Sequence, residues 1–487
     1  MSKTRRVIII GSGLGGLCCG YILSKNGYMV TVLEKNRQIG GCLQTFVRKG
    51  VKFETGMHYI GGMDEGEIMH SLFAYFNLLD NVTLSRLDPQ AYDIISVGDM
   101  RYPFANGREA CIETLIRYFP HERPALLKYW GGIGRVVNSS PMSAWQSSGQ
   151  LSPPSLDLFE HSASIFLRNT VANIRLRQVL AGNSILYAGV KNKTPLYYHA
   201  IIRDLYNRSS FRIAGGSDVI ARSLARSIEE SGGEVIPSSP VCKINCNKSQ
   251  AVSVTLQSGD DRPADYLVSA IHPSRLMEML DTELIRPVYR KRVLSLENTV
   301  SNFTVYIRFR KDAMPYLNSN FFHLSKDTAW DTTNYTANTW PKSFLYMHLC
   351  SSPGQVYADG AVLIAYMDFR ETAKWKGSQP GLRGDDYESF KQSKALRLID
   401  ALERQMPGTR IRIDSFYAST PLTYLDYTGT ESGSTYGILH DSSRPLETHL
   451  THRTKIPNLF IAGQNTYSHG MLGVMMGAIV AAGELLK

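Results

Sequence analysis

Three glycines and one acidic residue near the start of the chain have types and a spacing that can do chemistry. Gly11, Gly13 and Gly16 follow the apolar stretch VIII, and Glu34 follows the next apolar stretch, YMVTVL. Between a strand and a helix, the first glycine permits a tight turn, the second lets the backbone approach a pyrophosphate, and the third lets the helix pack on the sheet. The helix N-terminus offers N–H groups to the phosphates, and the carboxylate accepts hydrogen bonds from a ribose. This pattern predicts a dinucleotide site.

Two strands and a helix, predicted on either side of the glycine turn, must position these residues. The apolar residues before Gly11 predict a strand, the apolar residues after Gly16 predict a helix, and a second strand ends at Glu34. Asn26-Gly27 ends the helix with a pair that tolerates left-handed backbone geometry. A glycine fingerprint alone is weak evidence for a dinucleotide site. Here the strand, the helix, the helix end at Asn26-Gly27 and the acidic residue Glu34 all fit such a site. The alternative is that these glycines only form a turn.

The composition is typical of a large globular enzyme. The 487 residues are 43% apolar and 20% charged, which suggests two or three domains. The net charge of +10 favours an anionic surface or ligand, but the basic residues are spread along the chain. The densest cluster is Arg286, Arg290, Lys291 and Arg292, which we interpret first as a solvated helix face and second as a contact for acidic lipid headgroups. No motif supports nucleic-acid binding.

Cysteine spacing and hydropathy indicate the cellular compartment of the protein and whether it crosses a membrane. The seven cysteines have no zinc-like spacing, so we expect reduced thiols and no metal site. The most apolar run outside the N-terminal region, residues 470–483, is shorter than the roughly twenty residues that a membrane-spanning helix needs. We therefore expect a cytoplasmic protein that does not cross a bilayer, and we leave open a peripheral contact with the inner face of a membrane.

A second glycine pair distinguishes between dinucleotides. Gly40-Gly41 comes just after the second predicted strand. NAD enzymes have no need of such a pair, whereas an extended FAD continues past this turn with its pyrophosphate and ribityl chain. The sequence therefore favours FAD.

Two later segments support this choice. Residues 211–244 carry Gly215-Gly216, an amphipathic helix with Val219, Leu224 and Ile228 at helical spacing, and a strand around Val241. Residues 459–486 predict a strand, the pair Gly463-Gln464 and a helix from about residue 471. A further helix at 387–405, followed by a strand at 411–417, reads as scaffold.

Four stretches resemble a known group of flavoproteins. They are GGCLQTF, GMHYIGG, STPLTYLDYTGTESGSTYGI and NLFIAGQNTYSHGMLGVMMGA. They are similar to the phytoene desaturase, carotenoid isomerase and retinol saturase family over nearly the full length, and most similar to its retinol saturases. The sequence departs from the pattern at Gln464, where many such proteins have an acid for the ribityl hydroxyls. It also shows no signal peptide, so the compartment and substrate of animal retinol saturases are not carried over.

The resemblance implies an α/β fold with two parts. A Rossmann-like FAD-binding domain of the glutathione-reductase type would comprise residues 1–65, 211–275 and 435–487. An inserted α+β substrate domain would comprise residues 66–210 and 276–434.

The resemblance also implies which residues contact FAD. They are Gly11, Gly13, Leu14, Gly15, Gly16, Glu34, Lys35, Gly40, Gly41, Cys42, Thr45, Val241, Gly463, Gln464, Leu472, Gly473, Val474 and Met475. The helix that starts near residue 471 would direct its positive dipole end at the reduced flavin ring. Cys42 has two interpretations, a covalent flavin anchor or a small buried thiol, and we favour the thiol.

Four residues are candidates for proton transfer. The resemblance places His58 and Tyr59 of GMHYIGG, and Tyr467 and His469 of NTYSHG, near the flavin. A histidine with a pKa near neutrality suits general acid work. The alternative for each histidine is a hydrogen bond that only shapes a loop.

The substrate segments are rich in aromatic residues. All five tryptophans lie outside the three cofactor segments, as do the runs Tyr197-Tyr198, Phe321-Phe322 and Phe344 to Tyr346. A chamber for an extended lipid needs broad apolar walls, although aromatic residues also fill any large core. The stretch 419–424 is a candidate wall of this chamber.

The resemblance implies an FAD-dependent oxidoreductase that acts on a carbon–carbon double bond of an extended isoprenoid or polyunsaturated lipid. Saturation is favoured over desaturation and isomerisation. The alternatives are a flavin amine oxidase or protoporphyrinogen oxidase, and a non-enzymatic prenyl-lipid escort of the Rab GDP-dissociation-inhibitor type. We find no second glycine-rich βαβ unit for NAD(P)H in the sequence, so the electron donor or acceptor is not identified.

Overall fold

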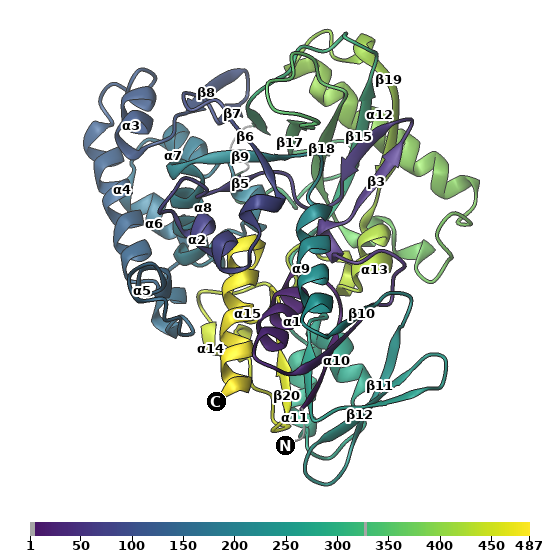
Figure 1. Cartoon of the computed structure of the whole chain (residues 1–487). Helices are drawn as coiled ribbons and strands as arrows, with labels where there is room; N and C mark the ends of the chain where they lie inside the picture. The colour runs from purple at the N-terminus through teal and green to yellow at the C-terminus, as the bar shows by residue number, and fades with distance from the viewer. Residues whose placement is uncertain (1–4, 326–328) are drawn as a thin grey trace.

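A five-stranded parallel sheet forms the base of the molecule (Figure 1). The computed structural model describes residues 5–325 and 329–487. The strand order is β10-β2-β1-β14-β20, and every neighbouring pair is parallel. The strands are β1 (Arg6–Ile10), β2 (Met29–Leu33), β10 (Glu234–Ile236), β14 (Tyr266–Ser269) and β20 (Leu459–Ile461). The sheet thus combines three segments that are far apart in the sequence.

The helix α1 (Leu14–Lys25) contacts this sheet and lies against α9 (Asp218–Glu230) and α15 (Gly470–Leu486). Gly11 turns the chain with a φ of +98°, a backbone conformation that favours glycine. A Cβ on Gly16 would overlap the carbonyl oxygen of Gly11, so only glycine lets α1 approach this closely. The predicted strand, turn and helix are confirmed.

One strand of the parallel sheet was not predicted. The sequence suggests a strand around Val241, but β10 comes first and pairs Val235 with Val32 of β2. Three residues are too few to show an alternating pattern. The predicted strand around Val241 is confirmed as β11 (Val241–Cys246), which forms a separate antiparallel sheet with β12 (Ala251–Leu256) and β13 (Asp261–Pro263).

A seven-stranded sheet forms another layer, with the order β19-β15-β18-β17-β16-β7-β8. All its neighbours are antiparallel except β16 and β7. Its strands are β7 (Asp93–Val97), β8 (Met100–Phe104), β15 (Ser301–Phe309), β16 (Asn320–Leu324), β17 (Ser343–His348), β18 (Gly360–Met367) and β19 (Ile413–Ser419). The helix α12 (Asp385–Gln405) packs on β15 and β19. The predicted scaffold helix is therefore present, and the strand after it starts two residues later than expected.

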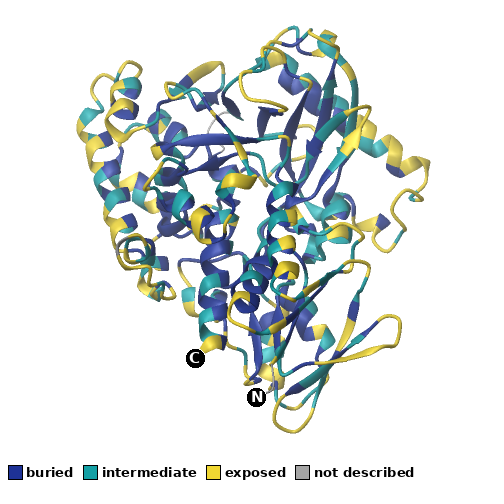
Figure 2. Cartoon of the chain, in the orientation of Figure 1, coloured by how far each residue is buried: buried dark blue, intermediate teal, exposed yellow. Residues whose placement is uncertain are grey.

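Helices cover the other side of the molecule (left in Figure 1). They are α2 (Ile68–Tyr75), α3 (Arg108–Ile116), α4 (Arg123–Asn138), α5 (Pro141–Ser148), α6 (Ala163–Thr170), α7 (Ile174–Leu180) and α8 (Leu196–Arg208). Figure 2 shows that the outer helices alternate buried and exposed residues, as surface helices do. By contrast, α8 is mostly buried, and it packs on α4, α6 and β5 (Ile60–Gly61).

Short elements complete the chain. The hairpin β3 (Thr45–Arg48) and β4 (Val51–Glu54) lies within the first cofactor segment, and β6 (Thr83–Arg86) joins β5 and β9 (Ser210–Ala214) in a small sheet. The remaining helices are α10 (Pro273–Met279), α11 (Pro287–Leu294), α13 (Pro421–Thr428) and α14 (Pro445–Thr448). Across the described residues, every helix is too short or too polar to span a bilayer.

Candidate functional site

A cavity of about 420 Å³ is lined by the glycine turn, α8, the seven-stranded sheet and the start of α15. This volume lies in the range of small-molecule sites. Most of the residues predicted to contact a cofactor line this cavity. They are Gly11, Gly13, Leu14, Gly15, Glu34, Lys35, Gly40, Gly41, Cys42, Val241, Gly463, Gln464, Leu472, Gly473 and Val474.

At one end of the cavity, which we call the α1 end, the backbone leaves room for a ligand. Gly13 caps α1, and a Cβ added there would meet no atom within 4 Å. The first N–H groups of α1 have no acceptor within the helix, so they are free to bind an anion. The α1 end therefore has the shape and the polarity that a pyrophosphate needs.

Glu34 is placed at the α1 end by three hydrogen bonds. Its Oε2 accepts from the backbone N–H of Ser12 at 2.9 Å and from the Ser12 hydroxyl at 2.6 Å. Its Oε1 accepts from the backbone N–H of Asn36 at 2.9 Å. These bonds fix the carboxylate on the cavity wall, where it can accept from ribose hydroxyls. Next to it, Lys35 donates to the carbonyl of Asp426 at 2.6 Å, and burial lowers the pKa of Lys35.

Two close contacts between glycines bring the chain segments of the α1 end together. A Cβ on Gly15 would lie 2.9 Å from Cα of Gly463, and a Cβ on Gly41 would lie 3.1 Å from Cα of Gly13. Gly40 has a φ of +109°, and its N–H donates to the carbonyl of Ser12. The predicted pair after β2 thus packs directly on the first glycine turn.

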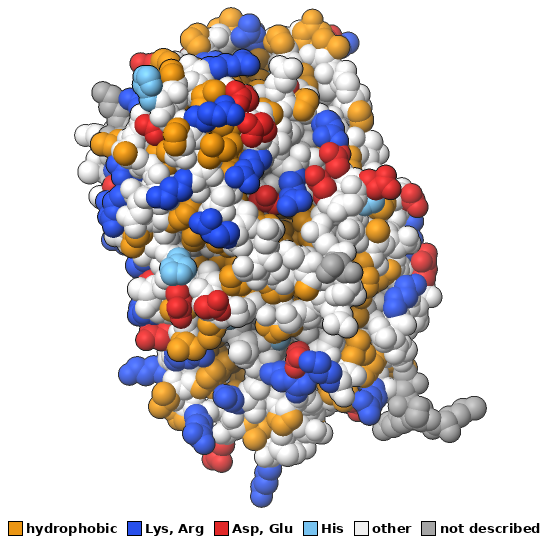
Figure 3. Space-filling model, turned by 90° about the vertical axis from the view of Figure 1, so that its left-hand side faces the viewer, with side chains coloured by type: hydrophobic (Ala, Val, Ile, Leu, Met, Phe, Trp, Pro, Cys, Tyr) orange, Lys and Arg blue, Asp and Glu red, His pale blue; other side chains and the backbone are white. Residues whose placement is uncertain are grey.

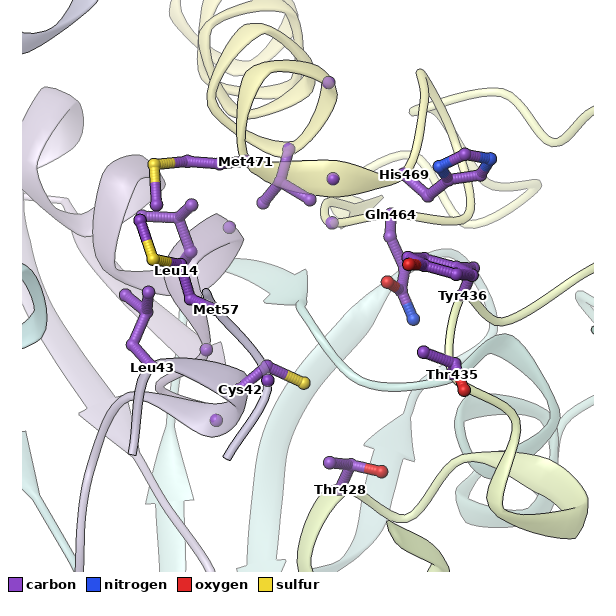
Figure 4. A pocket seen from close by; sticks show the side chains of 18 of the residues that line it. Leu14, Cys42, Leu43, Met57, Thr428, Thr435, Tyr436, Gln464, His469 and Met471 are labelled. Carbon is purple, nitrogen blue, oxygen red and sulfur yellow. The ribbon is translucent and has the colours of Figure 1, made fainter. Parts of the chain in front are cut away.

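At the other end of the cavity, the α15 end, several polar groups face a ligand. Gln464 extends into the open space between Leu14 and Tyr436 (Figure 4). Six lining residues carry a buried polar atom that has no hydrogen-bond partner in the described protein. These atoms are Tyr198 OH, Asn302 Oδ1, Ser434 Oγ, Thr435 Oγ1, Tyr467 OH and His469 Nδ1. A flavin ring, with nitrogen and oxygen atoms along its edge, fits such a set of donors and acceptors.

Three of the residues predicted to contact the cofactor do not line the cavity. Gly16 lies against Gly11, where its role is helix packing. Thr45 is buried in β3 and pairs with Glu54 of β4. Met475 is fully buried in the core, and the neighbouring residues of α15, Val474 and Met476, line the cavity instead. On a helix, a shift of one residue turns the side chain by about 100°, which resemblance alone does not resolve.

Cys42 lies at the cavity with its sulfur directed toward the open space (Figure 4). Burial raises the pKa of its thiol. The thiolate is the reactive form, so the raised pKa disfavours a nucleophilic cysteine. Cys42 is nevertheless exposed to the cavity, so it differs from the small buried thiol that we favoured.

The pKa values of the two candidate histidines, His58 and His469, are lower than we expected. Burial lowers the pKa of His58 to about 4, with a further contribution from Arg212, and burial alone lowers the pKa of His469 to about 4. Both imidazoles are therefore neutral at physiological pH. We expected a pKa near neutrality, which would require better solvation or a nearby carboxylate.

Tyr59 has a partner that the sequence did not reveal. Its hydroxyl donates to Oδ2 of Asp93 at 3.3 Å, and its ring stacks on Tyr206 with centroids 4.2 Å apart. Asp93 is fully buried in β7, and this burial raises the pKa of its carboxyl to about 7. Burial also raises the pKa of Tyr59. This pair brings a titratable group close to neutrality beside the cavity.

Several lining residues were missed by sequence reasoning. Tyr198, Ile202 and Tyr206 share one face of α8 at a spacing of four residues and line the cavity together. From the sequence we noted Tyr197-Tyr198 only as an aromatic run. The spacing of four residues already indicated that Tyr198, Ile202 and Tyr206 share one face of a helix. Tyr424 of α13 lines the cavity too, so the predicted wall at 419–424 reaches the cavity through this residue.

Another part of the lining is apolar. The side chains that we call the apolar wall come from α2, α5, α8, β17, β18 and the segment before α8. They are Met69, Met142, Ile185, Ile201, Ile202, Leu205, Leu345 and Ile364. A wall of this kind excludes water and binds hydrocarbon rather than polar groups.

Comparisons with known proteins agree with this geometry. The model of the family described as flavin containing amine oxidoreductase matches residues 14–383. Human all-trans-retinol 13,14-reductase is 27% identical, covering 99% of this chain and 85% of that protein. Prolycopene isomerase 2 of an Oncidium hybrid cultivar is 21% identical, covering 98% of this chain and 82% of that protein. These relatives confirm the predicted resemblance.

A solved structure shares the fold. Cyclohexylamine oxidase from Brevibacterium oxydans matches with a TM-score of 0.63 and 16% identity, and the match covers 100% of both chains. It confirms the predicted fold class, a Rossmann-like FAD-binding domain with a substrate domain. The family model spans most of the chain, so this protein belongs to the flavin containing amine oxidoreductase family, and its cofactor is FAD.

Proposed function

We propose that the protein is an FAD-dependent oxidoreductase that acts on a carbon–carbon double bond of an extended isoprenoid or another polyunsaturated lipid, with saturation as the favoured direction. The observation that carries this proposal is the charge pattern of the cavity. Among the described lining residues, only Glu34 and Lys35 are acidic or strongly basic, and both lie at the α1 end. The apolar wall therefore offers a hydrocarbon chain a site without charged groups.

The relatives support this substrate class. Their names refer to all-trans-retinol and prolycopene, which are polyenes. A protonated amine would instead be stabilised by a carboxylate or an aromatic cage. No carboxylate lies near the α15 end among the described lining residues, so an ion pair with a protonated amine is disfavoured there.

We propose that His58, Tyr59, Tyr467 and His469 are the groups that bind or move a proton. FAD, when bound, exchanges hydride with the substrate. The chain must then orient the double bond and provide a proton. Tyr59 is the strongest candidate, because its hydroxyl is bonded to the buried Asp93. The neutral imidazoles of His58 and His469 can still donate or accept a hydrogen bond.

We also propose the domain division 1–65, 211–275 and 435–487 for FAD, and 66–210 and 276–434 for the substrate. The strands of the parallel sheet come from the first set of segments, and the apolar wall comes mainly from the second. The predicted cofactor residues that line the cavity are proposed as FAD contacts.

A cytoplasmic protein that draws its substrate from the inner face of a membrane fits this chemistry. Figure 3 shows basic side chains scattered among hydrophobic ones on the face formed by the outer helices, without a single dense patch. In the cluster on α11, Arg290 and Arg292 donate to backbone carbonyls of neighbouring segments. Arg286 and Lys291 are exposed on the same helix, beside the exposed Val288. We propose weak, salt-sensitive contact with acidic lipid, which flotation with anionic and neutral vesicles would measure.

The function is tested with the purified holoprotein. After confirming the flavin absorbance, we would reduce the cofactor anaerobically, add retinoids and carotenoids, and analyse the products by mass spectrometry. A gain of two hydrogens with oxidation of the flavin would support saturation. A change without mass difference would replace it with isomerisation, and a loss of two hydrogens with the oxidised enzyme would indicate desaturation. Reduction of the flavin by amines alone would overturn the proposal.

A further inference from the structure

Four aromatic side chains form a row that begins at the cavity and leads away from it. We call His469, Tyr198, His440 and His449 the histidine row. The ring centroids of successive members are 4.6, 5.4 and 5.4 Å apart. His469 and Tyr198 line the cavity, whereas His440 and His449 lie beyond it. His449, at the end of α14, is only half-buried, so the row connects the α15 end with the protein surface.

Every member of the row carries a buried polar atom without a hydrogen-bond partner among the described residues. The atoms are Tyr198 OH, His440 Nε2, His449 Nδ1 and His469 Nδ1. Leaving one such atom unpaired destabilises the folded protein, because the atom loses its hydrogen bond to water and gains none in return. Buried polar groups are usually paired, so four adjacent exceptions need an explanation. Packing does not provide it, because an apolar ring at each position would fill the same space without this cost.

The surroundings of the row are aromatic rather than charged. Phe159 lies beside Tyr198, His440 and His449, with ring centroids 4.9 to 6.4 Å away. The titratable groups that act on His440 are His449 and His469, and His452 acts on His449. The acid next in sequence, Asp441, is bonded to Ser443 and paired with Arg444. Burial lowers the pKa of all three histidines of the row, which keeps their rings neutral.

A neutral imidazole has one nitrogen that accepts and one that donates, and a tyrosine hydroxyl does both. Such groups, bridged by buried waters, pass a proton along by exchanging which atom holds it. Among the described residues no hydrogen bond joins successive members of the row, whose ring centroids lie 4.6 to 5.4 Å apart, so transfer along the row requires one bridging water between each pair. The row therefore has the chemistry of a relay rather than of a proton store.

We propose that the histidine row conducts protons between solvent at His449 and the reaction cavity at His469. This inference rests on the proposed function and deepens it. Saturating a double bond adds one hydride and one proton. The hydride carries both electrons and comes from flavin that an external two-electron reductant has reduced, so the proton alone must cross the protein. In the relay, a proton taken up at His449 displaces one from His469 into the cavity, and the row returns to its neutral state.

The kinetic test uses His440→Phe, which keeps a ring of similar shape but removes both nitrogens. Holoprotein reduced with dithionite is mixed with the polyene in a rapid-quench instrument. We expect saturated product to form at least about tenfold more slowly, as the loss of assisted proton transfer predicts. The solvent deuterium isotope effect should increase, while flavin content and polyene affinity stay unchanged. A merely structural role would not move the isotope effect. Product formation at the wild-type rate would overturn the proposal.

The matched control is Tyr129→Phe. Tyr129 is also buried, and its hydroxyl bonds His199 at 2.8 Å, but it lies outside the row and the cavity. We expect this variant to keep the wild-type rate and isotope effect. A loss equal to that of His440→Phe would show that removing any buried polar ring has this effect, and would overturn the relay.

A second measurement does not depend on turnover. In wild-type holoprotein labelled with ¹⁵N-histidine, a relay open to water predicts fast solvent exchange of the ring N–H of His440, with His199 as the protected reference. The signal of His440 is identified by its loss in His440→Phe. Protection of both rings would overturn the path, even if that variant lost its flavin. If no polyene reacts, the proposed function fails, and the exchange rate still decides whether the path exists.

Discussion

Gly13 and Gly16 belong to the same turn but meet different surroundings. Gly13 has a φ of −62° and opens onto the cavity, whereas a Cβ on Gly16 would overlap the backbone of Gly11. We therefore expect Gly13→Ala to fold normally and to lose flavin, because the methyl group occupies the space for the pyrophosphate. Gly16→Ala should be destabilised by about 3 kcal/mol through overpacking. Thermal unfolding and flavin absorbance after purification separate the two. Equal stability of the variants would contradict this division of roles.

A second prediction at this scale concerns Tyr59. Removing its hydroxyl in Tyr59→Phe leaves the ring stacked on Tyr206 but frees Asp93 from its tyrosine partner. If this hydroxyl delivers the proton, turnover should fall by about 10²-fold or more. The pH–rate profile of the wild type should change near the raised pKa of Asp93, about 7, and flatten in the variant. Tyr206→Phe is the control, since among the described residues its hydroxyl donates to the backbone carbonyl of Tyr59 and not to Asp93. Equal losses in both variants would exclude a special role for Tyr59.

At the scale of elements, α8 determines the width of the cavity. One side of this helix packs on α4 and α6, and the other presents Ile202 and its neighbours to the apolar wall. We expect Ile202→Phe to narrow the chamber and to reduce kcat/KM for long polyenes about tenfold relative to short ones. Ile202→Val, which adds space, should not show this preference. An unchanged chain-length profile would place the substrate elsewhere.

The elements also show what the sequence could predict. The strand, turn and helix around Gly11 were predictable, because each local signal agrees with the next. The three-residue strand β10 was not, because its place depends on pairing with β2 rather than on its own pattern. The cavity face of α8 was within reach, since Tyr198, Ile202 and Tyr206 repeat every four residues.

The site was predicted less completely than the fold. The glycines and Glu34 are local to one turn, so their spacing reveals them. Asp93 is separated by 34 residues from Tyr59, and no sequence pattern links the two. The electrostatics of His58 and His469 depend on burial, which the residue type does not encode.

At the scale of the whole molecule, buried histidines predict sensitivity to acid. Burial is the largest cause that lowers the pKa of nine histidines, among them His58, His452 and His469 to about 4, and His199 and His348 to about 3. Between their ordinary pKa of 6.5 and these values, the unfolded chain binds more protons than the folded chain. The free energy of unfolding therefore falls as pH is lowered through this window.

Two buried carboxyls act in the opposite direction. Burial raises the pKa of Asp93 and Glu54 to about 7, so their contribution to stability falls as pH rises between about 4 and 7. Because the histidines outnumber them, we expect a lower urea midpoint for the holoprotein at pH 5 than at pH 7.5. A histidine whose pKa falls from 6.5 to about 4 contributes about 2 kcal/mol to this loss at pH 5, because only the interval between pH 6.5 and 5 has been crossed. A midpoint that stays constant or rises on acidification would contradict the prediction.

The contact between Gly15 and Gly463 has a consequence for biosynthesis. These residues are separated by most of the chain, yet a Cβ on the first would lie 2.9 Å from Cα of the second. During translation, the amino-terminal turn emerges long before the segment that carries Gly463 and α15. The nascent polypeptide therefore cannot complete this contact progressively. Cofactor loading must wait until α15 has left the ribosome, and it then depends on the cellular supply of the cofactor.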